Sequence, residues 1–109
     1  MTTAEAVERL VRDEPRYVPA LRAAIAVAQD SNVANLGTFT ARDVRRKLRD
    51  WGDGPADYMP PLTHLVTLGL LQRVEQNRKT PQYLMPQREA VVAALESKRV
   101  GVRHPEELP

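Results

Sequence analysis

The sequence contains no cysteine, and among its 109 residues there are only two histidines and two serines. Without cysteine the chain can form neither a disulfide scaffold nor a thiolate metal site, and it is compatible with a reducing compartment. The histidines are His64 and His104, and neither serine, Ser31 or Ser97, lies in a nucleophile signature. No glycine-rich phosphate loop is present, and the spacing of the carboxylates suggests no metal site. We therefore expect no enzymatic activity and no metal or cofactor.

Long apolar segments are also missing. The longest, residues 23–28 and 90–95, are far shorter than the roughly 20 residues that cross a bilayer as a helix. The first 15 residues carry acids where a signal peptide needs an apolar run. We therefore expect a cytoplasmic protein with no membrane partner. The length and the 42% of hydrophobic residues predict a single domain over residues 1–99 and a flexible tail over residues 100–109.

The charge is distributed unevenly, although the net charge is only +2. Residues 31–50 carry five Lys/Arg and two acids, a net +3, and residues 71–88 carry four Lys/Arg and one Glu, also a net +3. Residues 51–70, between them, hold two Asp and no Lys or Arg. Two separate basic blocks indicate a polyanion partner more strongly than the total charge does.

Hydrophobic spacing predicts two helices before residue 31. Thr3 is a candidate cap for a short first helix, which Pro15 ends. The second helix runs from about residue 18 to residue 30. It is rich in alanine, which suits a seam between two protomers and burial inside one protomer equally well. Residues 31–37 are small, polar and closed by a glycine, so we expect a loop there.

Residues 38–51 predict a very short strand followed by an amphipathic helix. Thr40 and Asp43 fit a capping box, so the helix should begin near Ala41. One face is apolar and should join the core: Ala41, Val44, Leu48 and Trp51. Another face is basic: Arg42, Arg45, Arg46 and Arg49. The basic face either contacts phosphate groups or is a solvated surface with salt bridges to Asp43 and Asp50.

Residues 58–68 predict a further helix, capped by Asp57 and followed by Gly69 in the left-handed position that ends a helix. Prolines are tolerated in the first helical turn, so the helix includes both prolines of this stretch. The inward face is expected to contain Leu62, Leu65, Val66 and Leu68. The opposite stripe is expected to contain Pro60, Thr63, His64 and Thr67.

After that helix, residues 71–76 and 82–85 predict two strands joined by a basic turn, Asn77–Thr80 with the following proline. Residues 87–99 predict a last helix with a narrow apolar stripe that includes Val91 and Leu95. The three tyrosines are expected to be half-buried packing residues, and Trp51 is expected in the core.

This order of elements resembles a winged helix-turn-helix domain over residues 18–86, with residues 71–85 as the wing. The most specific parts of the resemblance are Phe39–Val44 and Leu65–Leu71. The helix after the wing is similar to that of MarR-like and ArsR-like regulators, in which terminal helices join two protomers. The expected fold is therefore mainly α with a small β-hairpin, a winged helix with additional N- and C-terminal helices.

The resemblance implies a small double-stranded DNA-binding protein, a homodimeric transcription regulator. The helix over residues 58–68 would enter the major groove and the wing would lie on the backbone or in the minor groove. The implied contacts are base edges for Pro60, Thr63, His64 and Thr67. Phosphate contacts are implied for Arg42, Arg45, Arg46, Arg49 and Tyr58. Wing contacts are implied for Arg73, Arg78 and Lys79.

The recognition stripe lacks the residues that read bases best. Direct readout favours Arg on guanine and Asn or Gln on adenine, and the stripe contains none of these. The same fold also serves for docking between proteins, and fold does not fix function. The alternative is a winged-helix protein–protein interaction module in a larger replication, phage or other complex, without DNA binding.

Overall fold

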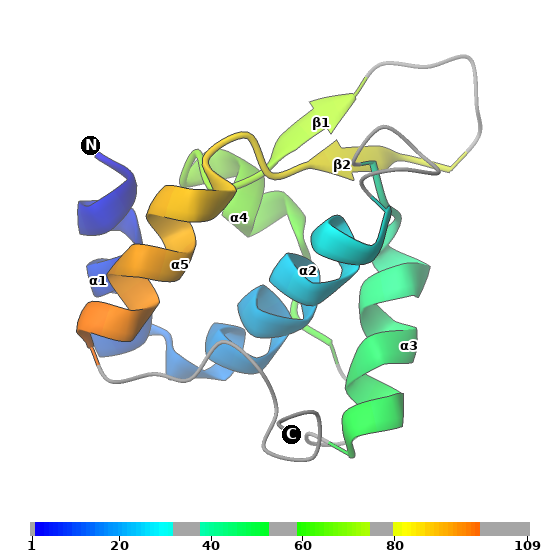
Figure 1. The fold of residues 1–109 in the computed structure, drawn as a ribbon, viewed down its shortest axis with the longest axis horizontal. Helices are drawn as coiled ribbons and strands as arrows, with labels where there is room; N and C mark the ends of the chain where they lie inside the picture. The colour runs from blue at the N-terminus through cyan, green and yellow to red at the C-terminus, as the bar shows by residue number, and fades with distance from the viewer. Residues whose placement is uncertain (1, 32–37, 53–58, 75–79, 99–109) are drawn as a thin grey trace.

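The computed structural model describes residues 2–31, 38–52, 59–74 and 80–98. The elements in chain order are α1 (Thr3–Asp13), the 3-10 helix η1 (Pro15–Tyr17), α2 (Val18–Ser31), α3 (Ala41–Trp51), α4 (Thr63–Thr67), β1 (Gln72–Val74), β2 (Gln82–Leu84) and α5 (Arg88–Ser97). This part of the chain is therefore mainly helical with a small two-stranded antiparallel sheet (Figure 1). The loop was predicted over residues 31–37, but Ser31 belongs to α2, and residues 32–37 lie outside the described residues. The tip of the hairpin and the tail after residue 98 also lie outside them.

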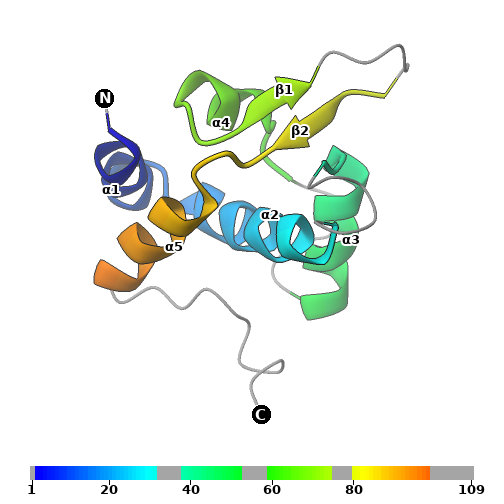
Figure 2. The same ribbon diagram turned by 45° about the horizontal axis from the view of Figure 1, so that its top comes forward.

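The two terminal helices, α1 and α5, pack side by side within one chain (Figures 1 and 2). Val7 and Leu10 of α1 and Val91 and Leu95 of α5 are completely buried. The cap of α1 is Thr2, one residue earlier than predicted, whose Oγ1 accepts a hydrogen bond from the Glu5 N–H at 3.2 Å. The apolar stripes of both helices are thus buried against each other and the core of the same protomer.

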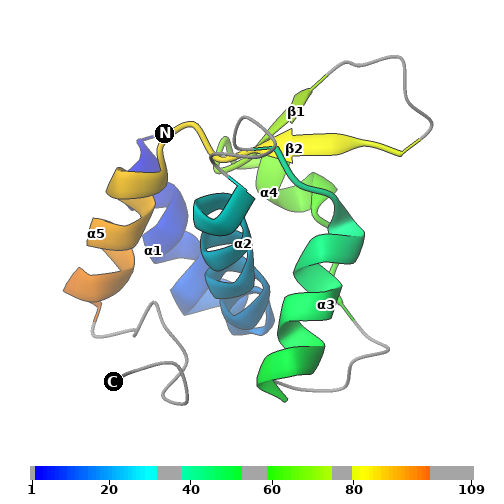
Figure 3. The same ribbon diagram turned by 45° about the vertical axis from the view of Figure 1, so that its right-hand side comes forward.

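Helices α2 and α3 form the second packed pair (Figure 3). The capping box predicted at the start of α3 is confirmed: Asp43 N donates to Thr40 Oγ1 at 3.2 Å, and Thr40 N donates to Asp43 Oδ2 at 2.9 Å. Val44, Leu48 and Trp51 are buried, as the helical wheel predicts. Since the apolar stripe faces the core, the arginine stripe of the same helix is left on the outside.

The short strand predicted around Phe39 is present as a single antiparallel bridge to Tyr83 of β2. In the hairpin, Gln72 lies opposite Leu84 and Val74 lies opposite Gln82. Tyr83 is buried and not half-buried as predicted, and the same is true of Tyr17. The hairpin is therefore anchored to the segment that enters α3.

Helix α4 is shorter than the predicted helix over residues 58–68, because it begins only at Thr63. A proline disfavours the α-helical conformation of the residue before it. Met59 and Pro60 each precede a proline, so the helix starts beyond the two prolines. The predicted stop is confirmed. Gly69 has φ +80°, its N–H donates to Val66 O at 3.0 Å, and the Leu70 N–H donates to Leu65 O at 3.0 Å.

One apolar core connects these elements. It extends from Ala6 and Val7 in α1 through Leu21, Ile25 and Leu65 to Leu95 in α5. Within the described ranges, no helix has the length and apolar character needed to cross a bilayer.

Candidate nucleic-acid interface

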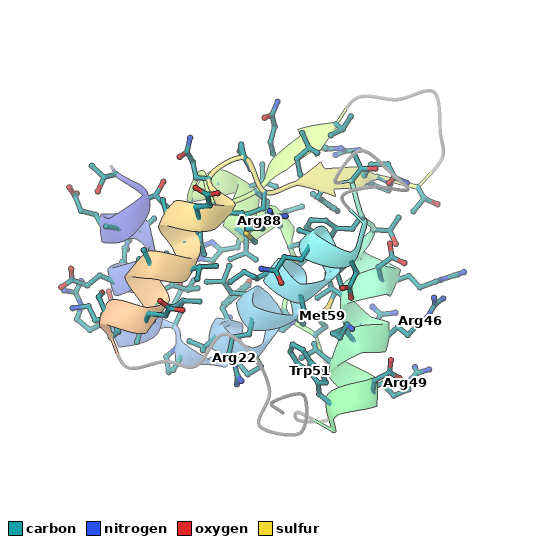
Figure 4. All side chains as sticks on the ribbon, in the orientation of Figure 1. Arg22, Arg46, Arg49, Trp51, Met59 and Arg88 are labelled. Atoms are coloured by element: carbon teal, nitrogen blue, oxygen red, sulfur yellow. The ribbon has the colours of Figure 1, made fainter. Side chains whose placement is uncertain are left out.

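The four arginines of the α3 stripe are all exposed: Arg42, Arg45, Arg46 and Arg49. In Figure 4, Arg46 and Arg49 extend from α3 on the side away from α2, whereas Trp51 points inward, toward α2 and Met59. The opposite directions of these side chains follow from the helical period, which places the apolar and the basic positions of α3 on different faces.

The salt bridges to Asp43 and Asp50 that the alternative includes are not formed among the described residues. Within the described part of the chain, none of the four arginines forms an ion pair with a carboxylate. Asp43 uses its carboxylate in the capping box. The fifth cation of the helix, Lys47, is half-buried, donates to Asp30 at 3.3 Å and lies 5.9 Å from the centre of the Trp51 ring. The arginine stripe therefore presents four guanidinium groups to solvent.

Close spacing of like charges on one helix face is mildly unfavourable in the free protein. The repulsion is relieved when the charges meet phosphates, because each guanidinium can donate two hydrogen bonds to phosphate oxygens. Binding also releases counterions from the nucleic acid, which gives such a surface a steep salt dependence. This stripe can thus bind phosphate groups.

The hairpin supplies one described cation, Arg73 of β1, which is exposed. The other two predicted wing contacts, Arg78 and Lys79, lie outside the described residues, as does Tyr58. The structure therefore describes the strands of the hairpin and not its basic tip.

On α4, Thr63 and Thr67 are exposed as predicted, but the rest of the stripe differs. Pro60 is buried, because it lies in the segment before the shortened helix and not on its outer face. This corrects its predicted position at the base edges. The Thr67 hydroxyl donates to Thr63 O at 3.1 Å, so its proton is already used within the helix.

His64 is half-buried and is turned toward the N-terminal part of the chain. Its Nε2 lies 2.5 Å from Glu14 Oε2, and its ring centre lies 5.0 Å from that of Tyr17. The prediction had placed His64 on the open stripe with Thr63 and Thr67. The sequence analysis predicted no contact of His64 with Glu14 or Tyr17. Glu14 and His64 are 50 residues apart, so no local sequence pattern indicates their contact.

Two shallow cavities, of about 300 and 380 Å³, lie beside α5. Arg88, which Figure 4 labels, lines both of them. Helix α5 lies on the other side of α2 from α3 (Figure 1). In the ranges that the structure describes, no group of three or more His, Asp or Glu is arranged to hold a metal ion.

The chain matches no protein-family model, no curated protein and no solved structure.

Proposed function

We propose that the chain is a winged helix-turn-helix protein that binds double-stranded DNA and regulates transcription. The observation that carries the proposal is the α3 stripe of four exposed arginines without carboxylate partners in the described chain. The order of α2, α3, α4 and the hairpin supports the fold assignment. So does the Phe39–Tyr83 bridge, which ties the hairpin to the start of α3.

Binding would depend mainly on phosphate contacts. The arginine stripe would contact one stretch of the DNA backbone. Arg73, Arg78 and Lys79 of the wing would contact another. Thr63 and Thr67 on α4 would face the bases. Thr63 can donate one hydrogen bond there, whereas Thr67, whose proton is used within the helix, can accept one or touch a thymine methyl group. Such a surface would bind duplexes of any sequence with an affinity that depends on salt, and with modest preference among sequences.

The proposal includes a homodimer and a cytoplasmic location. Since α1 and α5 pack on each other within one chain, two protomers would meet through the outward faces of these helices, where Ala90 and Ala93 are exposed. Sedimentation equilibrium measures this directly, and a monomer at all concentrations would remove the dimer from the proposal.

The test is fluorescence anisotropy of a labelled random-sequence duplex titrated with the protein at about 50 and 200 mM salt. We expect binding at the lower salt and a large loss of affinity at the higher salt, since counterion release drives a phosphate-based contact. Absence of binding at the lower salt would exclude the proposal, because non-specific affinity for DNA is strongest there.

One observation favours the second candidate, a protein–protein interaction module. The outer side of α4 offers two threonines, one with its proton already used, next to the partly exposed apolar residues Val66 and Leu68. A surface of this composition suits a protein partner as well as a DNA groove. The same titration separates the two, because a docking module has no reason to bind a duplex at low salt.

A further inference from the structure

Helix α4 cannot hold its own position, because it has only five residues. Isolated helices shorter than about 12 residues are marginal in water. Its N-cap residue, Leu62, provides no side-chain hydrogen bond to the first turn. The orientation of α4 must therefore come from tertiary contacts. Leu62 and Leu65 supply the apolar part, since both are buried in the core.

The polar part comes from the junction between α1 and η1. Glu14 Oε2 lies 2.5 Å from His64 Nε2, and the Tyr17 hydroxyl donates to Pro61 O at 3.3 Å. The Tyr17 ring also lies 5.0 Å from the His64 ring. Two short segments, separated by more than 40 residues of chain, thus share three contacts at the start of α4.

The N-terminal side of this junction is itself fixed. The Glu14 N–H donates to Leu10 O at 2.8 Å, and the Tyr17 N–H donates to Glu14 O at 3.0 Å. Tyr17 is buried, and the side chains of His64 and Glu14 are only 33% and 30% exposed. A hydrogen bond to a carboxylate that is largely shielded from water is stronger than an exposed one. The junction is therefore a firm support for α4.

We infer that Glu14 and Tyr17 are positioning residues that hold α4 through His64 and Pro61, and that His64 acts inside the protein and not at the DNA bases. The inference rests on the proposed function, because α4 is the element that would face the duplex. It predicts that the junction between α1 and η1 influences DNA affinity, although this junction is not part of the arginine stripe.

Direct binding of His64 to DNA is the competing explanation, and it predicts the opposite result for Glu14. If His64 contacted DNA, removal of the neighbouring negative charge would leave binding unchanged or strengthen it. If Glu14 holds α4 in place, its removal weakens binding although the protein becomes more positive. The sign of the change therefore distinguishes the two.

The experiment compares Glu14→Ala with Glu8→Ala in the full chain, using the labelled random-sequence duplex at low salt. Glu8 is the matched control, because it lies in α1, loses the same charge and pairs with Lys98 at 3.6 Å, away from α4. We expect Glu14→Ala to bind about fivefold more weakly than the parent, a typical effect for directly coupled neighbours. Glu8→Ala should bind at least as tightly as the parent. Equal affinity of Glu14→Ala and Glu8→Ala would overturn the inference.

A double-mutant cycle with His64→Ala adds a second criterion. Since Glu14 and His64 act through one hydrogen bond, Glu14→Ala/His64→Ala should bind no more weakly than His64→Ala alone. Weaker binding of His64→Ala with parental binding of Glu14→Ala would instead assign His64 to the DNA. Glu14→Gln keeps an acceptor oxygen, so it should restore most of the affinity. If the alanine variant does not fold, Tyr17→Phe takes its place, because it loses the hydroxyl that donates to Pro61 O and should also bind more weakly than the parent.

Amide hydrogen exchange without DNA tests this role of Glu14 independently of the proposed function. The N–H groups of Leu70 and Leu71 both donate to Leu65 O, at 3.0 and 3.2 Å, so they report on α4. We expect faster exchange at these two amides in Glu14→Ala and no change at Leu48 in α3. If the parent binds no duplex, the proposed function fails, and this measurement still decides whether Glu14 holds α4. Unchanged exchange at Leu70 and Leu71 would overturn the inference.

Discussion

Phe39 and Tyr83 exchange two backbone hydrogen bonds: Phe39 N donates to Tyr83 O at 3.0 Å, and Tyr83 N donates to Phe39 O at 2.8 Å. Their ring centres lie 6.3 Å apart, and Phe39 is among the largest completely buried side chains. This pair connects the hairpin to the residue before the cap of α3. The positions of the hairpin and of the arginine stripe are therefore linked through the core.

Replacement of Phe39 by alanine should destabilise the protein by about 3–5 kcal/mol, because a buried ring is removed and a cavity remains. The backbone bridge to Tyr83 would still be possible, so the decrease measures the side chain. Urea unfolding followed by circular dichroism gives the free energy of unfolding. Phe39→Leu removes less buried surface and should be less destabilising. An unchanged midpoint for Phe39→Ala would contradict the assignment of this residue to the core.

Gly69→Ala should cost about 1–2 kcal/mol of stability, because a residue with a Cβ is strained in the left-handed conformation. The position has φ +80°, and an added Cβ would meet no atom within 4 Å. The expected decrease therefore comes from backbone strain and not from a clash. Gly69→Asn is a suitable comparison, since asparagine tolerates this region better. If alanine and asparagine unfold at the parental urea concentration, the helix does not depend on this conformation.

Arg45→Ala/Arg46→Ala should weaken binding to duplexes of every sequence. It should also reduce the slope of affinity against salt by about 2, because each arginine neutralises one phosphate group. Arg9→Ala/Arg12→Ala is the matched control. It removes the same charge from exposed positions on α1, across the molecule from α3 (Figure 3). Anisotropy titrations at several salt concentrations measure both slopes. Equal slopes for the two double variants would show that net charge, and not the α3 stripe, determines binding.

Arg12→Gln should raise the pKa of the Asp13 carboxyl group toward its ordinary value. Hydrogen bonds from Arg12, at 3.0 and 3.2 Å, hold this pKa below that value in the folded protein. A lowered pKa in the folded state stabilises the protein above the unfolded pKa, and this stabilisation disappears as the pH falls through the folded pKa. NMR titration of the Asp13 side chain checks the direction. An unmoved pKa in the variant would show that Arg12 is not its cause.

The sequence predicted correctly those helix caps, faces and ends that depend on interactions between neighbouring residues. The Thr40–Asp43 capping box, the alternation of apolar and basic positions in α3 and the end of α4 at Gly69 are each set by a few neighbouring residues. The mainly helical fold with one hairpin follows from the same signals. The exposure of the arginine stripe could also be predicted, since it lies opposite the apolar face of its own helix.

The shortened α4 shows where local reasoning chose wrongly between two rules. Proline is tolerated in the first turn of a helix, but consecutive prolines also restrict the residues that precede them. The second effect prevails here, so the helix starts at Thr63 and Pro60 is buried. The prediction that Pro60 faces base edges was therefore wrong.

The helix faces, the caps and the basic stripe could be predicted from the sequence, because these depend on residues within one or two turns of each other. Three relationships became visible in the folded chain: α1 and α5 pack on each other, Phe39 pairs with Tyr83, and Glu14 contacts His64. The last two pairs join residues 40 or more positions apart. No periodicity encodes them, since they form only when separate apolar stripes are buried together.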